Sequence, residues 1–283
     1  MSKKPVIDII GTGRMALALL TSLAHSGYHV STVAGRNSSK LSKFKIQFNI
    51  EAVKLDSNFS TEADVVFLAV SDDAISDVAA ILDSSDGNIL AHTSGAQDVD
   101  VLQDAEEKGW KIASFHPLQT IPEDAEPEIF RDVYISLCGD TEACLVLSKI
   151  AKSIGAHPYD VSSAEKQKLH VAAVLTSNYM AALVKAAETL LDNPTIKTEQ
   201  LLGPLMEKSL REILDKGPDK ALTGPISRGD IKTIDKHLQI IKKTNQQGLY
   251  ELYKTLGRYA LQAAIDDKRL SQEKEKELEQ FLK

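Results

Sequence analysis

The sequence predicts a doubly wound, mostly parallel α/β sheet in its N-terminal part, followed by an all-helical C-terminal part. Two observations lead to this fold class. In the first 161 residues, short apolar segments alternate with segments of helical spacing, which is the βαβ rhythm of a parallel sheet with helices on both faces. From residue 162 onward, apolar residues recur at helical spacing and no strand pattern is present. We therefore predict two domains, residues 1–161 and 162–283.

The strands of the first domain are predicted from short apolar runs between turns. The run at 64–70 (DVVFLAV) is nearly continuous, as expected of a parallel strand that is buried on both faces. Helices are predicted at 14–26, which stops at Gly27, and at 143–153, which Gly155 closes. The predicted strands are 5–10, 29–34, 64–70, 88–92, 111–115 and 133–137, with a last short strand that ends near residue 161.

The second domain consists of predicted helices only. The first helix, at 168–191, is rich in alanine and leucine, and its part from Val171 to Leu191 is too apolar for a small domain alone. We therefore expect this domain to contact the substrate and to form a homodimer. The other predicted helices are 198–214, 231–243, 248–265 and a charged final segment, 273–282.

Composition excludes several classes of protein. The formal net charge of -7 over 283 residues argues against a nucleic-acid-binding surface. Cys138 and Cys144 form neither a metal-binding pattern nor a disulfide framework, so we expect reduced thiols and no metal. The N-terminal apolar run is too short for a signal peptide or a membrane span, which predicts a cytoplasmic protein without a membrane partner.

The turn after the first strand has the G-x-G-x-x-A pattern and opens the first helix. The first glycine permits a tight turn, the second lets the backbone approach a pyrophosphate, and the alanine allows close packing of the helix on the strand. Free N–H groups at the helix start then point at the phosphates. This context predicts a dinucleotide site of the Rossmann type rather than an ordinary glycine turn. The predicted cofactor contacts are Gly11, Thr12, Gly13, Arg14 and Met15.

The end of the second strand indicates which dinucleotide binds. Sites that prefer NAD usually carry an acidic residue here, which accepts hydrogen bonds from the ribose 2′-OH, but residues 28–44 contain no acid. Arg36 can instead face a 2′-phosphate, and Asn37 and Ser38 offer further donors. We therefore predict NADP as the cofactor. The alternative is that these three residues are only a surface turn.

Polar residues also follow later strands at their carboxyl ends, where parallel sheets bind ligands. Val70 and Ser71 are expected to line the cofactor crevice. His116 is a candidate catalytic residue, because histidine can donate a proton to a carbonyl oxygen near neutral pH. His92 and Ser94 are predicted to bind the substrate. The alternative is that both histidines are structural.

The helical domain contributes further candidates. His170, Val174 and Asn178 are spaced i, i+4, i+8 and would share one face of the predicted helix. Polar groups on an apolar helix need partners, so His170 and Asn178 are predicted to be catalytic, with an interdomain hydrogen bond as the alternative. Arg228 lies in a loop with two glycines and a proline. It can bind a substrate carboxylate or a phosphate, or it can pair with Asp230.

Together these motifs resemble a family of Rossmann-like oxidoreductases whose C-terminal helical domain is of unknown function. The resemblance covers nearly the whole chain and rests on GTGRMA, AGRN, HTSGA, SFHPLQT, LHVAAVLTSNYMAAL and LTGPISRGD. The family is similar in architecture to the 6-phosphogluconate dehydrogenase-like group. That group includes ketopantoate reductases, pyrroline-5-carboxylate reductases, prephenate dehydrogenases and deazaflavin-dependent NADP reductases.

The resemblance implies roles for individual residues. In ketopantoate reductases the corresponding helix reads Lys-x-x-x-Asn-x-x-x-Asn, which falls on His170, Val174 and Asn178. Two of these three positions differ, so His170 would replace the lysine as general acid, and the first asparagine is lost. In prephenate dehydrogenases a His-Pro strand end similar to His116-Pro117 contacts the substrate.

We therefore expect an NADP-dependent oxidoreductase that reduces a small carbonyl substrate, a 2-oxo acid, with ketopantoate as the first specific candidate. His170 or His116 would protonate the developing alkoxide, and Arg228 or Ser94 would hold a carboxylate. Two enzymatic alternatives are imine reduction and the oxidative decarboxylation of a cyclohexadienol. The alternative from another class is a non-catalytic NADP-binding sensor or scaffold.

Overall fold

The computed structural model describes residues 3–56, 59–83, 85–191, 195–244 and 246–283. The chain forms two compact units, Met1–Ser177 and Asn178–Lys283. The division follows helix α6 (Ser163–Thr176), whereas the domain boundary predicted from the sequence precedes it. Contacts of the α6 side chains with the sheet unit, described below, account for this difference.

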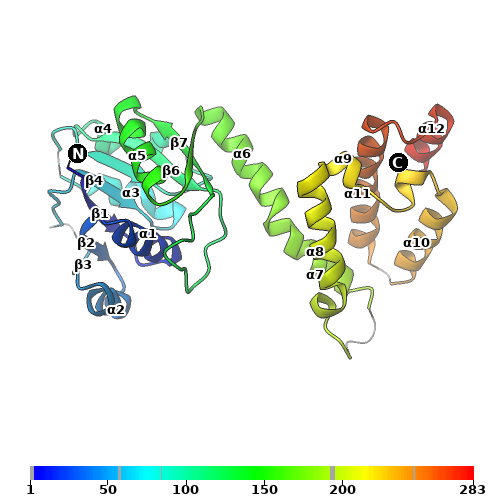
Figure 1. Cartoon of the computed structure of the whole chain (residues 1–283), viewed down its shortest axis with the longest axis horizontal. Coiled ribbons are helices and arrows are strands. Elements are labelled where there is room, and N and C mark those ends of the chain that lie inside the picture. The colour runs from blue at the N-terminus through cyan, green and yellow to red at the C-terminus, as the bar shows by residue number, and fades with distance from the viewer. Residues whose placement is uncertain (1–2, 57–58, 84, 192–194, 245) are drawn as a thin grey trace. The chain divides into compact units, whose positions relative to one another are not determined.

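The first unit contains an eight-stranded, mostly parallel sheet, which confirms the predicted fold class (Figure 1). Parallel pairing of β1 with both β2 and β4 places the reversal of strand order between β1 and β4. In doubly wound sheets this reversal point is where ligands bind. The strands, in their order across the sheet, are β3 (Glu51–Lys54), β2 (His29–Gly35), β1 (Val6–Ile10), β4 (Val65–Leu68), β5 (Ile89–His92), β6 (Lys111–Pro117), β7 (Tyr134–Gly139) and β8 (His157–Asp160).

Two features of the sheet differ from the sequence-based prediction. Strand β3 is absent from the prediction because it is a short edge strand with charged residues at both ends and no buried position. Strand β7 was expected to continue the parallel series, but it pairs with β6 in antiparallel orientation. The connection 118–133 contains no helix or strand, whereas the crossover of a parallel pair is usually a helix that packs on the sheet.

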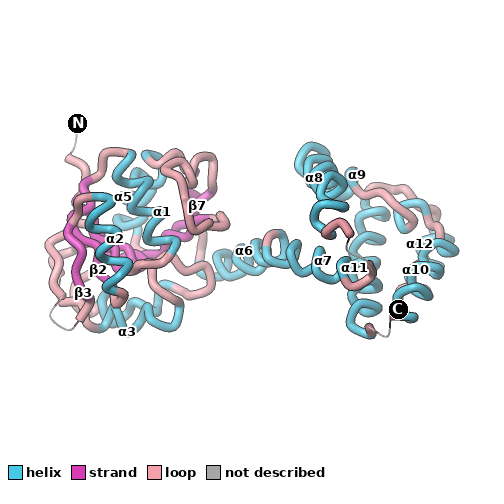
Figure 2. The backbone as a smooth tube through the Cα atoms, turned by 90° about the horizontal axis from the view of Figure 1, so that it is seen from below, coloured by secondary structure: helices cyan, strands magenta, loops and turns pink. Residues whose placement is uncertain are grey.

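Helices cover both faces of the sheet and bury two apolar layers. In Figure 2, α1 (Arg14–His25), α2 (Ser38–Phe48) and α5 (Thr141–Ser153) lie on one side of the strands and α3 (Ile75–Ala80) on the other. The first layer includes Leu19, Leu20 and Phe67. The second layer includes Ile75 and the buried residues of η2 (Val99–Leu102) and α4 (Gln103–Glu106). Burial on both faces explains the apolar runs that predict these strands.

Helix α6 begins and ends at positions that differ from the predicted helix 168–191. Its start is a capping box, in which Ser162 and Glu165 bond each other's backbone N–H groups. Its end is at Thr176, and the next helix, α7, covers Asn178–Glu188. The Thr176 and Ser177 hydroxyls donate to carbonyls one turn back, and such bonds often bend helices. The prediction that His170 and Asn178 share one helix face is therefore wrong.

The second unit is all-helical, as predicted. Its core contains Ile234, Leu238, Leu261 and Leu278, which come from three different helices. Among the residues that the structure describes, no helix has the length and apolar character that a membrane span requires. Besides α7, its elements are α8 (Thr198–Lys216), α9 (Pro218–Ala221), η3 (Ile226–Arg228), α10 (Ile231–Lys243), α11 (Gln247–Asp266) and α12 (Gln272–Phe281).

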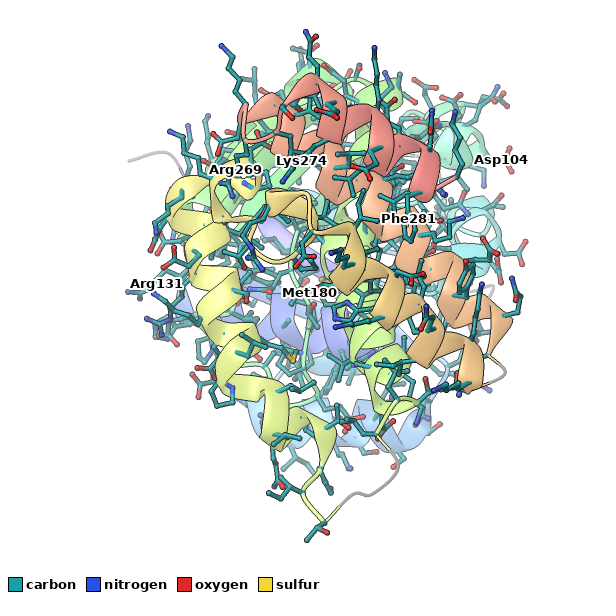
Figure 3. The ribbon with its side chains drawn as sticks, turned by 90° about the vertical axis from the view of Figure 1, so that its right-hand side faces the viewer. Asp104, Arg131, Met180, Arg269, Lys274 and Phe281 are labelled. Atoms are coloured by element: carbon teal, nitrogen blue, oxygen red, sulfur yellow. The ribbon has the colours of Figure 1, made fainter. Side chains whose placement is uncertain are left out.

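The segment between α8 and α10 is held by two basic side chains, which Figure 3 labels. Arg269 donates to the backbone carbonyls of Asp219, at 2.8 Å, and of Lys220, at 2.9 Å. Lys274 donates to the Arg228 carbonyl at 3.1 Å. The segment therefore has specific backbone partners, and the part around Arg228 that was predicted as a loop contains the short 3-10 helix η3.

Candidate functional site

The carboxyl ends of the central strands form one continuous edge. The residue after β1, Gly11, donates its N–H to Ala34 at 2.8 Å, and Ala69 after β4 donates to Ile10 at 2.8 Å. Thr93 after β5 donates to Leu68 at 3.1 Å. These bonds extend the strand ladder past each strand, so the loops after β1, β4 and β5 leave the sheet side by side.

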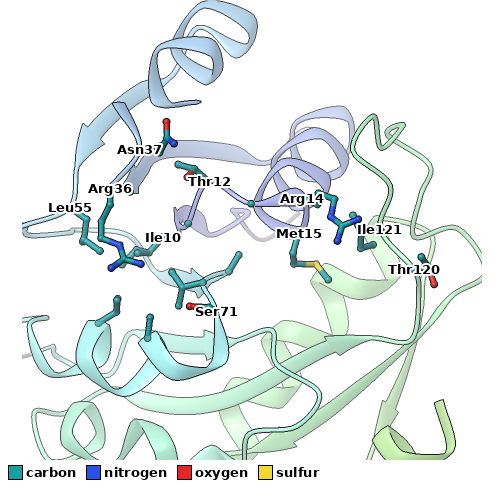
Figure 4. Close-up of a pocket in the computed structure, with 17 residues that line it drawn as sticks. Ile10, Thr12, Arg14, Met15, Arg36, Asn37, Leu55, Ser71, Thr120 and Ile121 are labelled. Atoms are coloured by element: carbon teal, nitrogen blue, oxygen red, sulfur yellow. The ribbon is translucent and has the colours of Figure 1, made fainter. Parts of the chain in front are cut away.

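A pocket of about 570 Å³ opens at this edge, above the reversal point between β1 and β4. Figure 4 shows Arg36 on one side of it and Arg14, Met15 and Ile121 on the other. The pocket contains nine of the ten residues predicted to bind the cofactor, and only Ser38 does not line it. The lining residues are Ile10, Gly11, Thr12, Gly13, Arg14, Met15, Gly35, Arg36, Asn37, Leu55, Ala69, Val70, Ser71, Ala74, Val78, Thr120 and Ile121.

The glycine turn has the geometry that a bound pyrophosphate requires. Gly11 has φ +138°, and a Cβ atom there would lie 2.1 Å from the Ala69 carbonyl oxygen. A Cβ at Gly13 would meet no described atom within 4 Å, so this backbone faces open space in the pocket. Gly13 is the N-cap of α1, and no side chain of the described residues caps the helix. The first N–H groups of α1 are therefore available to an anion.

The residues after β2 differ in their local roles. The Arg36 side chain is exposed and lines the pocket, and no ion pair joins it to a described residue. Asn37 also lines the pocket, but its side chain caps α2 by accepting from the Lys40 N–H at 2.9 Å. Ser38 is the first residue of α2. Arg36 is thus the cation of this turn that the geometry offers to a 2′-phosphate.

Two of the predicted histidines lie together in the first unit. The ring centroids of His116, on β6, and His170, on α6, are 5.9 Å apart and meet edge to face. Gly95, in the loop after β5, lies against both rings. A Cβ atom at this position would lie 2.5 Å from His170 Nδ1 and 2.6 Å from His116 Nε2. Only a residue without a side chain allows the loop to approach the pair this closely.

Two observations link the histidine pair to the cofactor pocket. Thr120 and Ile121, which line the pocket, follow His116 in the same segment after β6. Asp72 directly follows Ser71 of the pocket, and its charge acts on His116. The pKa of His116 is lowered to about 4, mainly by burial and also by the charges of Lys166 and His170, whereas the charge of Asp72 opposes the shift. His116 is therefore neutral at pH 7.

His92 is fully buried, at 0% exposure, beneath the loop that carries Gly95. Its Nδ1 accepts a hydrogen bond from the Ser94 N–H at 3.2 Å. Burial, with a smaller contribution from the charge of Lys166, lowers its pKa to about 3. Ser94 is buried as well, and its hydroxyl accepts from the N–H groups of Ala96 and Gln97. Both side chains thus support the loop, and their predicted contacts with substrate stay predictions.

The burial of His92 predicts a pH-dependent stability. Its pKa is about 3 in the folded protein and near 6.5 in the unfolded chain, so below pH 6.5 the unfolded chain binds a proton that the folded protein does not. The contribution of His92 to the free energy of unfolding is therefore fully present above pH 6.5 and is lost as the pH falls toward 3. Between pH 7 and pH 4.5 the loss due to His92 should be about 2 to 3 kcal/mol, since one pKa unit is about 1.4 kcal/mol.

Urea unfolding of the wild type and of His92→Asn at both pH values measures this contribution. Asparagine retains an oxygen acceptor for the Ser94 N–H but does not titrate. The free energy of unfolding of the variant should fall by about 2 to 3 kcal/mol less than that of the wild type. An equal fall in both proteins would show that His92 is not kept neutral by the fold.

The structure reveals one residue of this region that the sequence-based prediction missed. Lys166, on the first turns of α6, is only 2% exposed, and its ammonium donates to the backbone carbonyls of the loop after β5. The capping box at Ser162 and Glu165 is visible in the sequence. It would have started the helix early enough to place Lys166 and His170 at i, i+4 on one face.

The other predicted site residues belong to the second unit. Asn178 is the first residue of α7, and Arg228 is exposed at the end of η3. Asp230 does not form an ion pair with Arg228 among the described residues; its carboxylate caps α10 through Thr233. The histidine pair belongs to the first unit, so the roles of Asn178 and Arg228 stay predictions.

Two family models match separate parts of the chain. Residues 6–94 match the model described as NADP oxidoreductase, coenzyme F420-dependent. Residues 133–260 match a domain of unknown function. The first match confirms the predicted NADP cofactor and supports an oxidoreductase. The matched segment extends to Ser94. It includes the glycine turn and Arg36, whose geometry fits a dinucleotide. No curated protein sequence matches the chain.

Solved structures share this fold over almost the whole chain. A protein of Bacteroides fragilis described as a candidate NADP oxidoreductase is 23% identical, with a TM-score of 0.75 over 92% of this chain and 98% of its own. A protein of Thermotoga maritima is 24% identical, with a TM-score of 0.74 over 93% and 99%. An imine reductase of Myxococcus stipitatus in complex with NADP+ is 16% identical, with a TM-score of 0.62 over 92% and 95%. The chain therefore combines a segment that matches NADP oxidoreductases with a segment that matches a domain of unknown function, in a fold that solved oxidoreductases share.

Proposed function

We propose that this protein is an NADPH-dependent reductase of a small carbonyl substrate, a 2-oxo acid, with ketopantoate as the first candidate. The observation that carries the proposal is the contact of His116 and His170, with His116 near the carboxyl end of β6, on the sheet edge where the cofactor pocket opens. A non-catalytic NADP sensor would need the glycine turn and Arg36, but it would not need two histidines held against one glycine of the neighbouring loop.

The residues of the pocket divide into parts of a dinucleotide site. The turn from Gly11 to Gly13 and the first turn of α1 would hold the pyrophosphate, and Arg36 would hold the 2′-phosphate. Val70 and Ser71 would line the crevice, and Thr120 and Ile121 close its other side. NADPH, when bound, supplies the hydride. Apolar lining from Met15 and Ile121 would exclude water from the reacting carbon.

The two histidines have different proposed roles. His116 is neutral at pH 7, so it can orient the substrate oxygen through a hydrogen bond but is a poor acid. His170 is then the better of the two candidates for protonating the alkoxide that forms on the substrate. The edge-to-face contact keeps both rings within reach of one small substrate. Ser94, His92, Asn178 and Arg228 remain proposed contacts of the substrate or its carboxylate.

The proposal is tested by following NADPH consumption at 340 nm with a panel of small substrates. The panel contains 2-oxo acids, including ketopantoate, and cyclic imines, and prephenate with NADP+ is measured in the reverse direction. We expect consumption with at least one 2-oxo acid to exceed the rate with imines by about tenfold or more. Turnover of imines alone, of prephenate alone, or of no compound would contradict the 2-oxo acid assignment.

We also propose that the second unit forms a homodimer, in a protein that acts in the cytoplasm. Large apolar side chains of this unit are exposed in the single chain, among them Leu205 at 65%, Leu214 at 76% and Tyr259 at 75%. Leu205 and Leu214 lie on α8 and Tyr259 on α11. A second copy that covers α8 and α11 would remove this apolar surface from water.

A further inference from the structure

Lys166 is a buried cation in the first unit, and its hydrogen bonds to the described residues all go to one loop. Its Nζ donates to the Ser94 carbonyl at 2.9 Å and to the Gly95 carbonyl at 3.1 Å. A third bond goes to the Gln97 carbonyl. A lysine that is 2% exposed loses the hydration of its charge, so it is retained only where its donors find other acceptors. Here three carbonyls of residues 94–97 replace the water.

The same loop determines how the histidine pair is packed. Gly95 lies against both rings, and a Cβ atom in its place would be 2.5 Å from His170 Nδ1 and 2.6 Å from His116 Cε1. The loop backbone therefore packs directly against both imidazole rings. A shift of this loop would therefore change the space that is left to both imidazoles.

The groups around Lys166 explain why its charge is tolerated in this place. Asp98, which follows the loop, Asp72 of η1 (Asp72–Ala74) and Cys138 of β7 face the ammonium and partly offset the lowering of its pKa by burial. Asp98 is itself anchored, since its carboxylate accepts from the Val99 N–H at 2.7 Å and from the hydroxyl of Ser163 on α6. The charge of Lys166 in turn lowers the pKa values of His92 and His116.

We propose that Lys166 is a positioning residue, which holds the loop 94–97 so that Gly95 sets the separation and orientation of His116 and His170. Lys166 lies one helical turn before His170, so α6 carries both the anchor of the loop and one member of the pair. The loop follows β5 in the chain, and Lys166 bonds it to α6. That this positioning serves catalysis rests on the proposed function, whereas the positioning itself rests on the contacts of Lys166 and Gly95 alone.

The test compares the full-length protein, loaded with NADP+, with its variants Lys166→Met and Lys166→Arg. Methionine keeps most of the buried stem but removes the donors and the charge, whereas arginine keeps both. Lys168→Met, an exposed lysine on the same helix, is the matched control. Hydrogen exchange reports the loop through the N–H groups of Ala96 and Gln97, which bond the Ser94 hydroxyl. The titration of His116 and His170, followed by NMR of labelled imidazoles, reports the pair.

In Lys166→Met we expect exchange of the Ala96 and Gln97 N–H groups to be about tenfold faster, because the loop carbonyls lose their buried donor. The imidazole resonances of His116 and His170 should shift, and His116 should titrate at higher pH. Lys166→Arg should restore most of both signals, and Lys168→Met should change neither. Exchange in β1 and α1 and the Kd for NADP+ should stay as in the wild type.

Unchanged loop exchange and unchanged imidazole signals in Lys166→Met would overturn the proposal, and so would an equal acceleration at all N–H groups, which indicates general loss of stability. Should Lys166→Met not fold, Gly95→Ala tests the same geometry, since its methyl group must displace one of the rings. Unchanged imidazole signals in Gly95→Ala would also overturn it. Failure of the proposed function has a different signature: no turnover of 2-oxo acids, while the exchange and titration signals still respond to Lys166.

Discussion

Replacement of Arg36 by alanine is expected to weaken NADPH binding on the order of 100-fold and to leave NADH binding nearly unchanged. The guanidinium lines the cofactor pocket and has no ion-pair partner among the described residues, so its donors are available to a 2′-phosphate. Two charge-assisted hydrogen bonds to a phosphate account for a loss of this size. NADH carries a neutral 2′-hydroxyl instead, so it has no ionic interaction with the guanidinium to lose.

The measurement is the Kd of each dinucleotide by fluorescence titration of wild type and Arg36→Ala. Lys40→Ala is the matched control, because Lys40 is a nearby exposed cation that does not line the pocket. This control should change the NADPH Kd only a few-fold, through general electrostatics. Equal losses of NADPH and NADH affinity in Arg36→Ala would show that Arg36 does not select the 2′-phosphate.

Replacement of His170 by asparagine is expected to lower kcat for 2-oxo acid reduction by about 100-fold or more, with the Kd for NADPH unchanged. His170 lies outside the lining of the cofactor pocket, so we expect cofactor binding not to depend on it. Of the two histidines in contact, it is the one proposed to supply the proton. Asparagine keeps a hydrogen-bonding side chain of similar shape, but it does not titrate near neutral pH and so cannot act as the general acid.

His116→Asn should have a different kinetic effect, because a neutral His116 orients the substrate rather than protonating it. We expect a higher KM and a smaller loss of kcat than in His170→Asn. His157→Asn is a suitable control, since His157 lies exposed on β8, near Asp132 and away from the pocket. Steady-state kinetics with the best 2-oxo acid decide between these outcomes. Full activity in both His170→Asn and His116→Asn would remove the proposed acid from this pair.

The cofactor site could be predicted from the sequence because its features are local. A glycine with positive φ, an open second glycine and a helix start follow one another within six residues, and Arg36 follows the next strand. Each of these features depends on neighbours in the chain, and strand–turn–helix geometry then brings them to one pocket. The apolar strands were predictable for a similar reason, since burial on both faces leaves continuous apolar runs.

The substrate side depends on contacts between distant segments. The approach of His116 to His170, and of both to Gly95, joins residues from β6, α6 and the loop after β5. No spacing in the sequence encodes such a contact, and Lys166 looks like any lysine on a charged helix start until the loop carbonyls surround it. The antiparallel direction of β7 could not be predicted either, because it depends on the path of segment 118–133 and not on the residues of the strand.

The sequence by itself therefore determined the fold class, the glycine turn and the NADP cofactor. The first two follow from apolar periodicity and local backbone geometry, and the cofactor follows from Arg36 and the absence of an acid after the second strand. Only the tertiary structure decided that α6 ends before Asn178, that it packs with the sheet unit, and that His170 meets His116 there. The physical reason is the range of the interactions. Propensity and turn geometry act over a few residues, whereas a buried lysine finds its acceptors only after the chain has folded.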